Sequence, residues 1–548
     1  MAPRNKGTYI ALATPLVVLT VLLVYPVVSV IFRGLTAGAG MTFTDTVIFN
    51  WPYLEFTIFQ AILSTIMSLL VGLPGAMLLA RLKFKGKNIV RALIITPFVL
   101  PPIVVVIGFL QMFGQYGVID SFLMWALRSG SSVLNLATDI PGIILAHTFY
   151  NVPLVILLVS ASMERMNPEI EEAAEILGAD SLQRFQRITL PHIMPSLIAA
   201  TILTFLFCFM SFPIVLAFGH GSYRTIEVQI WNAFRWADYG QASSLVLIQI
   251  LFTLTLALAY SRLARSSDGA RGPTSSIKTS SLSSYRPTEV IMIILYFAAM
   301  LILVVGPIAS IFRAAFFDPI AQRYTLDGFR YIFSGEAGGG LRPLINSLFY
   351  SSLATLLSVG LGIPLAYAHG SKTRFLRPLS SIMVLLPLGI SSITVAYGLM
   401  TAIAVPTGLN INPWPIIVLA QTVIGLPFTT RSIEISRRSI DPLLIEQADA
   451  LGASRLQRLF FVELPLLAPG ILVGAVFAFA MAIGEMSATL FIALPQNFTL
   501  AVAIYDNLGV RKFVEAGASA LILMVACIVA FLAMEKVSEE SVGGILKW

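Results

Sequence analysis

The chain has 548 residues, of which 57% are hydrophobic and only 11% are charged, and its formal net charge is +7. A soluble domain carries about 25% charged residues, so this chain lacks the polar surface that would cover a core in water. Its basic residues are spread over short loops and form no patch interleaved with aromatic residues, which argues against a nucleic-acid partner. The two cysteines, Cys208 and Cys527, fall in separate apolar stretches, so they indicate neither a metal site nor a disulfide framework.

Apolar segments long enough to cross a bilayer recur along the chain, since a helix needs about 20 such residues to span the hydrocarbon. The first segment is too long for the apolar region of a signal peptide, and we expect it to be retained. The sequence therefore predicts an all-α membrane protein with about twelve transmembrane helices. In chain order the expected spans lie near residues 8–32, 56–80, 90–114, 140–162, 193–218, 242–262, 288–312, 344–368, 378–405, 413–430, 466–494 and 514–534.

A hydrophilic, Ser-rich stretch at residues 266–287 interrupts the apolar pattern and is typical of a flexible linker. It separates a first six-span half, residues 1–265, from a second, residues 288–548. Lys and Arg concentrate in alternate loops, and this bias predicts that both termini and the linker are cytoplasmic. We expect a multi-pass protein of the inner or plasma membrane.

The two halves repeat each other most closely in the loop between their fourth and fifth spans. Because each repeated unit has an even number of spans, both copies have the same orientation, and a pseudo-two-fold axis along the membrane normal should relate them. The matched residues share one constant offset: Glu172 with Glu446, Ala174 with Ala448, Gly178 with Gly452, Leu190-Pro191 with Leu464-Pro465, and Pro195 with Pro469.

The first copy of this loop predicts two short helices. Pro168 opens the first helix, acidic residues fill its first turns, and Gly178 ends it. A second helix is expected over Ser181–Ile188, ended by Leu190-Pro191. The small residues Ala173 and Ala174 would let another surface approach, and Glu172 would offer it a carboxylate for an Arg or Lys. The loop therefore has the features of a docking knob.

This pattern resembles the loop signature of binding-protein-dependent ABC importer permeases: Glu-Ala-Ala, three residues, Gly, about nine residues, a hydrophobe, one residue and Leu-Pro. The first copy fits it fully, and the second departs only at Gln447, which replaces an Ala. The resemblance implies that the loops are coupling helices that dock on two copies of a separate P-loop ATPase subunit, and that an extracytoplasmic solute-binding protein delivers the solute. The residues that carry it are Glu172, Ala173, Ala174, Gly178, Leu190 and Pro191, and Glu446, Gln447, Ala448, Gly452, Leu464 and Pro465.

The chain contains no Gly-x-x-x-x-Gly-Lys-Ser/Thr motif of its own, so ATP hydrolysis is expected in the partner. We expect no catalytic residues, no cofactor and no metal site. Two rivals remain: a proton- or sodium-coupled secondary transporter with six plus six helices, and a membrane-embedded enzyme, which four histidines make a poor fit.

Fused two-half chains of this length look like the thiamine and ferric-iron importers. The segment from Ser211 to Gln249 is similar to the thiamine branch, whereas Gly484-Glu485 followed by Ala488-Thr489-Leu490 is similar to iron-type and anion-type members. Both solutes stay open at this point.

Polar residues inside expected spans are candidates for the transport path, because an ionisable group in hydrocarbon is costly unless it is paired or faces water. His147, Asn151 and Glu485 are such candidates, and interhelical hydrogen bonding is the alternative for each. On the expected outer face, Glu227, Trp231, Arg235 and Tyr505 are candidate contacts for a binding protein, although aromatic residues there also anchor a protein at the lipid interface.

Overall fold

The computed structural model describes residues 6–36, 43–268, 280–282, 285–319, 321–334, 340–369, 379–380, 383–384 and 386–542. These residues are overwhelmingly helical, which confirms the predicted all-α class. Two minimal strand pairs accompany the helices: β1 (Leu82–Lys83) pairs with β2 (Ser280–Ser281) in parallel, and β3 (Phe317–Asp318) pairs with β4 (Arg323–Tyr324) antiparallel. Most of the expected linker, residues 266–287, lies outside the described residues.

In the described part of the chain, eleven helical segments are long and apolar enough to cross a membrane. At the expected ninth span, 378–405, the described residues form a shorter apolar helix, Ser392–Thr407. The eleven segments contain α1 (Lys6–Leu19) with α2 (Tyr25–Thr36), α4 (Trp51–Arg81), α6 (Pro102–Phe113) with α7 (Val118–Leu127), α8 (Asp139–Glu164), α10 (Ser181–Arg184) with α11 (Leu190–Phe209), α14 (Tyr239–Asp268), α15 (Pro287–Phe316), α17 (Leu341–His369), α21 (Trp414–Arg438), α23 (Arg455–Arg458) with α24 (Leu464–Ile483), and α27 (Phe513–Val542).

Shorter helices connect or flank these segments. They are α3 (Phe43–Phe49), α5 (Lys87–Val99), α9 (Pro168–Ile176), α12 (Pro213–Phe218), α13 (Ile226–Arg235), α16 (Asp327–Phe333), α19 (Ser392–Leu399), α20 (Val405–Thr407), α22 (Pro442–Ala450), α25 (Ser487–Ile492) and α26 (Leu500–Gly509), with 3-10 turns at Leu386–Leu388, Leu409–Ile411 and Pro495–Asn497.

The expected third span, 90–114, is not one continuous helix. It is broken between α5 and α6, where Leu100 is extended. Pro101 explains the break, because a proline ring disfavours helical backbone in the residue before it. Helix resumes at Pro102, whose missing N–H costs nothing in a first turn.

Four π-helical turns interrupt the described helices, at Thr20–Val24, Phe185–Thr189, Met400–Ala404 and Leu459–Glu463. In each, the residue after the turn donates its N–H five residues back, as Leu190 does to the Phe185 carbonyl. The next residue is a proline every time: Pro26, Pro191, Pro406 and Pro465. A proline ring collides with the carbonyl four residues before it, so the wider turn makes room for the ring and the helix continues.

The chain folds into two compact units that are not consecutive in sequence. Unit 1 combines Met1–Phe43, Ala233–Ile250 and Thr325–Trp548, and unit 2 combines Thr44–Asn232 with Leu251–Tyr324. Each unit therefore contains most of one repeat together with the first span of the other repeat. In unit 1, α1 packs on α17 and α2 on α19, whereas in unit 2, α15 packs on α5 and α6.

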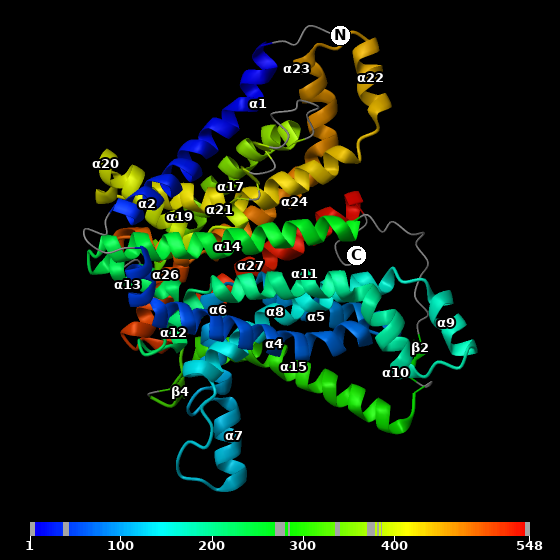
Figure 1. Cartoon of the computed structure of the whole chain (residues 1–548). Helices are drawn as coiled ribbons and strands as arrows, with labels where there is room; N and C mark the ends of the chain where they lie inside the picture. Colours follow the sequence, from blue (N-terminus) through cyan, green and yellow to red (C-terminus); the bar gives the residue numbers. More distant parts are fainter. Residues whose placement is uncertain are drawn as a thin grey trace. The chain divides into compact units, whose positions relative to one another are not determined.

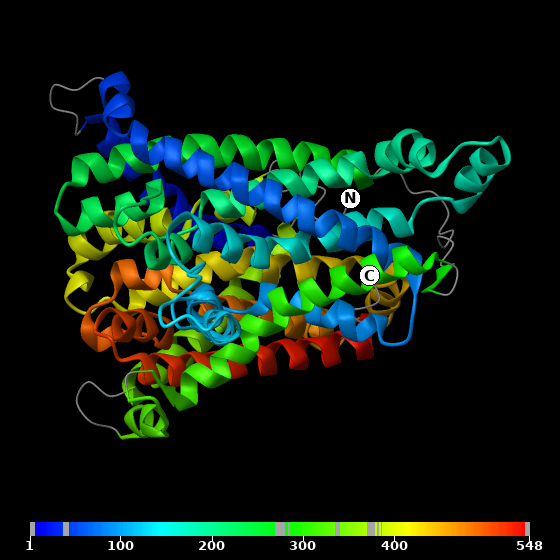
Figure 2. The same cartoon turned by 90° about the horizontal axis from the view of Figure 1, so that it is seen from below.

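Within unit 2, α4, α8 and α11 pack against one another and lie side by side in both views (Figures 1 and 2). Their contact face on α4 carries small and polar residues one turn apart: Gln60, Ser64, Ser68 and Gly72 are all buried. A Cβ on Gly72 would lie 2.8 Å from the Val155 Cβ of α8. Small residues of this kind let membrane helices approach closely.

Unit 1 repeats this arrangement with α17, α21 and α24. Here the close approach depends on Gly474 of α24, where an added Cβ would lie 3.0 Å from the Thr429 Cα of α21. The equivalent spans of the two repeats thus pack in the same order, each within its own unit.

The exchanged first spans also dock in the same way. A Cβ on Gly108 of α6 would lie 2.4 Å from the Pro307 carbonyl oxygen of α15, and one on Gly398 of α19 would lie 2.9 Å from the Pro26 Cβ of α2. In unit 2, the Arg313 guanidinium then donates to the Gln111 amide oxygen at 3.1 Å. In each unit a glycine, which has no side chain, lets the first span of the other repeat pack closely.

We predict that Gly72→Ala lowers the thermal stability of the protein. The added methyl group collides with Val155 and costs about 1–3 kcal/mol, which outweighs the gain in helix propensity of about 1 kcal/mol. Gly360→Ala in α17 is the matched control, since its Cβ would meet no atom within 4 Å. Thermal unfolding followed by size-exclusion in detergent measures both, and equal midpoints for the two variants would contradict the packing described.

Candidate functional site

The first copy of the repeated loop is a helical knob built from α9 and α10, beyond the end of α11 that is remote from α12 (Figure 1). Asn167 caps α9 by accepting the Glu169 N–H at 3.1 Å, and Pro168 follows in the first helical position. Gly178 ends the knob's first helix with a φ of +87°. The Ala179 N–H then closes the turn on the Ala174 carbonyl at 2.9 Å, a bond typical of a Schellman helix end.

The second copy repeats each of these features with different residues. Asp441 caps α22 by accepting the Leu443 N–H at 2.9 Å, and Gly452 has a φ of +83°. Ser454 and Gln457 form a capping box on α23, as Asp180 and Gln183 do on α10. The predicted helix starts and glycine ends are present in both copies.

The predicted end of the second loop helix at Leu190-Pro191 is wrong. From α10 the helix runs through the π-helical turn Phe185–Thr189 into α11. Pro191 sits in the first turn of α11, where the preceding π turn accommodates its ring. In the second copy α23 continues into α24 past Leu464 and Pro465 in the same manner. Each knob is therefore rigidly joined to the fifth span of its repeat.

An ion pair holds the two short helices of each knob together, and it falls at equivalent positions. Arg184 donates to Glu175 at 2.6 Å, and Arg458 donates to Asp449 at 2.7 Å. Such partly exposed pairs contribute at most about 1 kcal/mol, so they orient the helices more than they stabilise the fold.

A second set of contacts ties each knob to the second span of its repeat. In unit 2, Glu171 of the knob accepts from Arg81 of α4 and from the Thr189 hydroxyl, each at 2.6 Å. In unit 1, Glu463 replaces Thr189 at the equivalent position; it accepts from the Tyr367 hydroxyl of α17 and, at 2.8 Å, from Arg458. Both repeats therefore link the knob to the second span, through an Arg–Glu contact in one repeat and a Tyr–Glu hydrogen bond in the other.

The signature residues divide between an outer and an inner side of the knob. Glu172 and Glu446 are exposed, as are Ala173 and Gln447 at the next position. Ala174 and Ala448 are half-buried, and their carbonyls accept the hydrogen bonds that close the helix ends. Of the two predicted small residues, only Ala173 therefore lies on the exposed side.

Sequence reasoning missed the most exposed apolar residues of the knobs. The side chains of Leu177 and Leu451 are 87% and 89% exposed, and Ile176 beside Leu177 is 85% exposed. The signal was present, since Leu177 and Leu451 occupy the same place before the glycine in both copies. Both knobs therefore present an exposed leucine at the same position, and in the first knob Ile176 adds to this apolar surface.

His147 and Asn151 of α8 lie in a buried polar cluster with Ser64 of α4 and Cys208 of α11. The His147 Nδ1 is 3.0 Å from the Ser64 hydroxyl, and the Asn151 amide donates to the His147 carbonyl at 2.8 Å. Within the described residues the His147 Nε2 has no hydrogen-bond partner. The structure brings these two candidates together inside unit 2.

The equivalent of His147 in the second repeat is Gln421 of α21, which sequence reasoning did not select. Gln421 is buried, and neither atom of its amide has a hydrogen-bond partner among the described residues. The repeat pairs Ala146 with Ala420, and the residue after each of these alanines is polar. This match could have identified Gln421 from the sequence.

Glu485 uses both carboxylate oxygens within its own segment. One accepts the Ala488 N–H at 2.7 Å, and the other accepts the N–H and the hydroxyl of Thr489 at 2.9 and 2.8 Å. These bonds cap the short helix α25, so the carboxylate has a local structural role.

The four candidate contacts for a binding protein are not equally exposed. Glu227 and Trp231 are buried, and the Trp231 ring centroid lies 6.0 Å from that of Phe212. Arg235 is exposed and lies near Tyr505, whose pKa is raised because the effect of burial exceeds the opposing effect of that guanidinium. The neighbouring Trp236, in the same loop, is 83% exposed.

The family described as "binding-protein-dependent transport system inner membrane component" matches the chain twice, at residues 72–270 and 358–542. Each match contains one complete copy of the knob. These two segments together cover more than half of the sequence.

Three curated relatives share the name thiamine transport system permease protein ThiP. The protein from Salmonella typhimurium is 25% identical over 504 residues, 89% of both chains. The Escherichia coli protein is 24% identical over 90% of both chains, and the Brucella abortus protein is 26% identical over 89% of this chain and 87% of the relative.

We predict that Gly178→Ala loosens the first knob without affecting the spans. A Cβ there meets no atom within 4 Å, so its cost is the left-handed backbone, about 1–2 kcal/mol. Amide hydrogen exchange over residues 169–177 should quicken about fivefold or more. Gly509→Ala is the control, with equally open space but no left-handed φ. Unchanged exchange in the Gly178 variant would show that Gly178 does not set the helix end.

Proposed function

Because the chain belongs to the family of inner membrane components of binding-protein-dependent transport systems, we propose that this multi-pass membrane protein is the permease of an ABC importer that carries thiamine inward. The observation that carries the proposal is the doubled knob, which has the same caps, ion pair and exposed leucine in both repeats. Neither a secondary transporter nor a membrane enzyme accounts for two such surfaces.

The knobs are the docking surfaces for two copies of a separate ATPase subunit. Leu177 and Leu451 enter an apolar recess of the partner, and burying each removes a large exposed apolar side chain from water. Glu172 and Glu446 lie on the same short helices and pair with basic residues at the rim of the recess. One fused chain with two knobs binds two ATPase copies.

Motion of the ATPase reaches the membrane through two connections. The knob is continuous with the fifth span, α11 or α24, through a π-helical turn. It is also bound to the second span, by Arg81 in one repeat and by Tyr367 in the other. Displacing a knob therefore displaces both spans together, which supports alternating access of a central path to the two sides.

The solute arrives from the opposite side with an extracytoplasmic binding protein. The exposed pair Arg235 and Trp236, beside Tyr505, supports this contact. With the knobs facing the ATPase, both termini are cytoplasmic. Within unit 2 we assign His147 and Asn151 to the path, because buried hydrogen-bonding groups in a membrane mark polar routes.

Thiamine is the proposed solute because the named relatives are thiamine permeases and span nearly the whole chain. The Gly484–Leu490 segment resembles iron-type permeases, and we attribute this resemblance to the helix cap that Glu485 makes on α25. That carboxylate accepts three hydrogen bonds within its own segment, and this structural role accounts for it without ferric iron.

Uptake by the complete transporter tests the proposal. The chain is reconstituted in liposomes with its ATPase and binding protein, and uptake of labelled thiamine is measured with and without ATP. We expect uptake only with ATP and with the binding protein present. Uptake driven by a proton or sodium gradient without ATP would overturn the permease assignment, whereas ATP-driven uptake of ferric iron alone would overturn the solute.

We predict that reversing the charge at both knobs, Glu172→Lys with Glu446→Lys, abolishes ATP-coupled transport while the protein still inserts. The change leaves the spans untouched and opposes the basic rim of the partner. Glu169→Lys is the matched control, because Glu169 is an exposed carboxylate on the same short helix. Transport and ATPase activity are measured on the same liposomes. Full transport by the double variant would contradict the docking role.

A further inference from the structure

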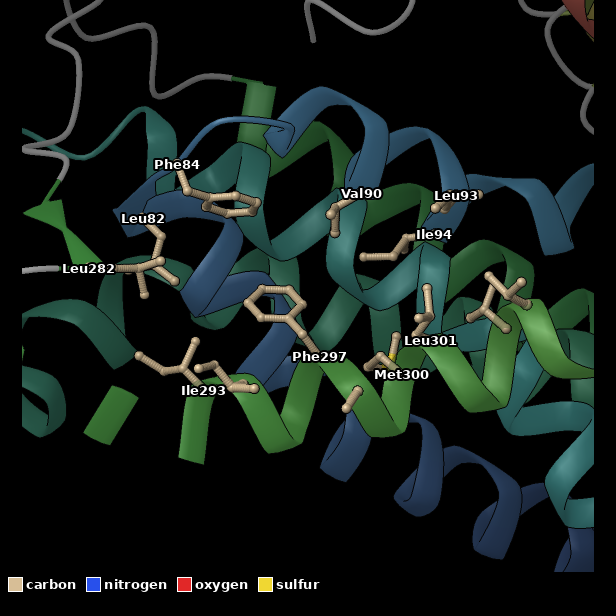
Figure 3. A pocket seen from close by; sticks show the side chains of 14 residues that line it. Leu82, Phe84, Val90, Leu93, Ile94, Leu282, Ile293, Phe297, Met300 and Leu301 are labelled. Atoms are coloured by element: carbon tan, nitrogen blue, oxygen red, sulfur yellow. The ribbon is translucent and has the colours of Figure 1, made fainter. Parts of the chain in front are cut away.

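An apolar groove lies in unit 2 between α5 and α15, away from the knobs. It has a volume of about 390 Å³, and every side chain that lines it is apolar. The Phe84 and Phe297 rings both line it and lie close together, with ring centroids 5.9 Å apart (Figure 3). We call it the α5–α15 groove; its lining is Leu82, Phe84, Val90, Leu93, Ile94, Leu282, Ile293, Ile294, Phe297, Ala298, Met300, Leu301, Val304 and Val305.

The groove opens to the surroundings of the protein along α15. The span Pro287–Phe316 is the least buried of the candidate spans, with 22% of its apolar window inside the protein. Ile294 and Leu301 at the groove's edge are exposed, whereas Ile94, Met300 and Val304 at its floor are buried in the core. In a bilayer, this opening faces the hydrocarbon.

The contents of the groove follow from its lining. Water is excluded because the lining offers it no hydrogen-bond partner. An empty groove would forfeit dispersion contacts along its whole wall. The neighbouring molecule that fits an apolar, elongated space beside a span is the acyl chain of a lipid.

The charge at one end of the groove selects the head group. Leu82 and Phe84 line the groove, and the alternating residues Lys83 and Lys85 are exposed. Lys87 begins α5 directly after them. Clustered cations at the end of a span attract anionic lipid head groups. Arg91 contributes less to this cluster, since it is paired with Glu164 at 3.1 Å, a carboxylate that also lies near Lys87.

We propose that the α5–α15 groove is a binding site for an anionic phospholipid, with one acyl chain between α5 and α15 and the phosphate beside Lys83, Lys85 and Lys87. The site does not depend on the transported solute. It holds the first span of the second repeat against the third span of the first repeat.

Photolabelling locates the lipid. The full chain is placed in nanodiscs with phosphatidylglycerol that carries a diazirine on one acyl chain, and labelled peptides are identified after irradiation. We expect label on residues 84–94 and 293–305. Unlabelled phosphatidylglycerol should displace it about tenfold better than phosphatidylcholine, and Lys83→Gln with Lys85→Gln should remove that preference.

Filling the groove provides the matched test. Ala298→Phe places a ring in the groove and should abolish labelling of these peptides. Ala299→Phe changes the next residue, which is also exposed but does not line the groove, and should leave labelling intact. Labelling spread evenly over α15 and unchanged by Ala298→Phe would overturn the site. Equal displacement by both lipids in the unaltered protein would overturn its anionic selectivity.

Discussion

In hydrocarbon each backbone N–H and carbonyl must find its partner within the protein, and some prolines of this chain illustrate two distinct ways of meeting that constraint. Where the helix has to continue, a π-helical turn precedes the proline, as at Pro191 and Pro465. Where it has to break, an extended residue precedes the proline, as at Leu100. The π-helical turn keeps each knob continuous with its fifth span, and the extended residue breaks the third span.

The duplication preserves geometry more strictly than it preserves residues. Asn167 and Asp441 make the same cap, and Thr189 and Glu463 occupy the same anchoring position with different partners. Hydrogen-bond acceptors of different chemistry satisfy the same backbone donors, so a cap survives such a replacement. The preserved features are the glycine-ended helices of the knob and the exposure of its leucine, and both support the docking role that we propose.

Exchange of the first spans links the two repeats within single units. Gly108 and Gly398 admit Pro307 and Pro26, so each compact unit contains segments of both repeats. Neither repeat therefore packs only against its own spans, because each unit includes the first span of the other repeat. The α5–α15 groove is a consequence of the same exchange, because its two walls come from different repeats.

The sequence by itself determined the membrane class, most of the span positions, the duplication and the knob signature, because these depend on composition, apolar length and local spacing. It also determined the caps around Pro168 and Gly178, which are local backbone chemistry. Only the tertiary structure decided which first span joins which unit, that Trp231 is buried and Leu177 exposed, and that Glu485 caps α25. Those outcomes depend on the fit between surfaces remote in sequence, which no local pattern records.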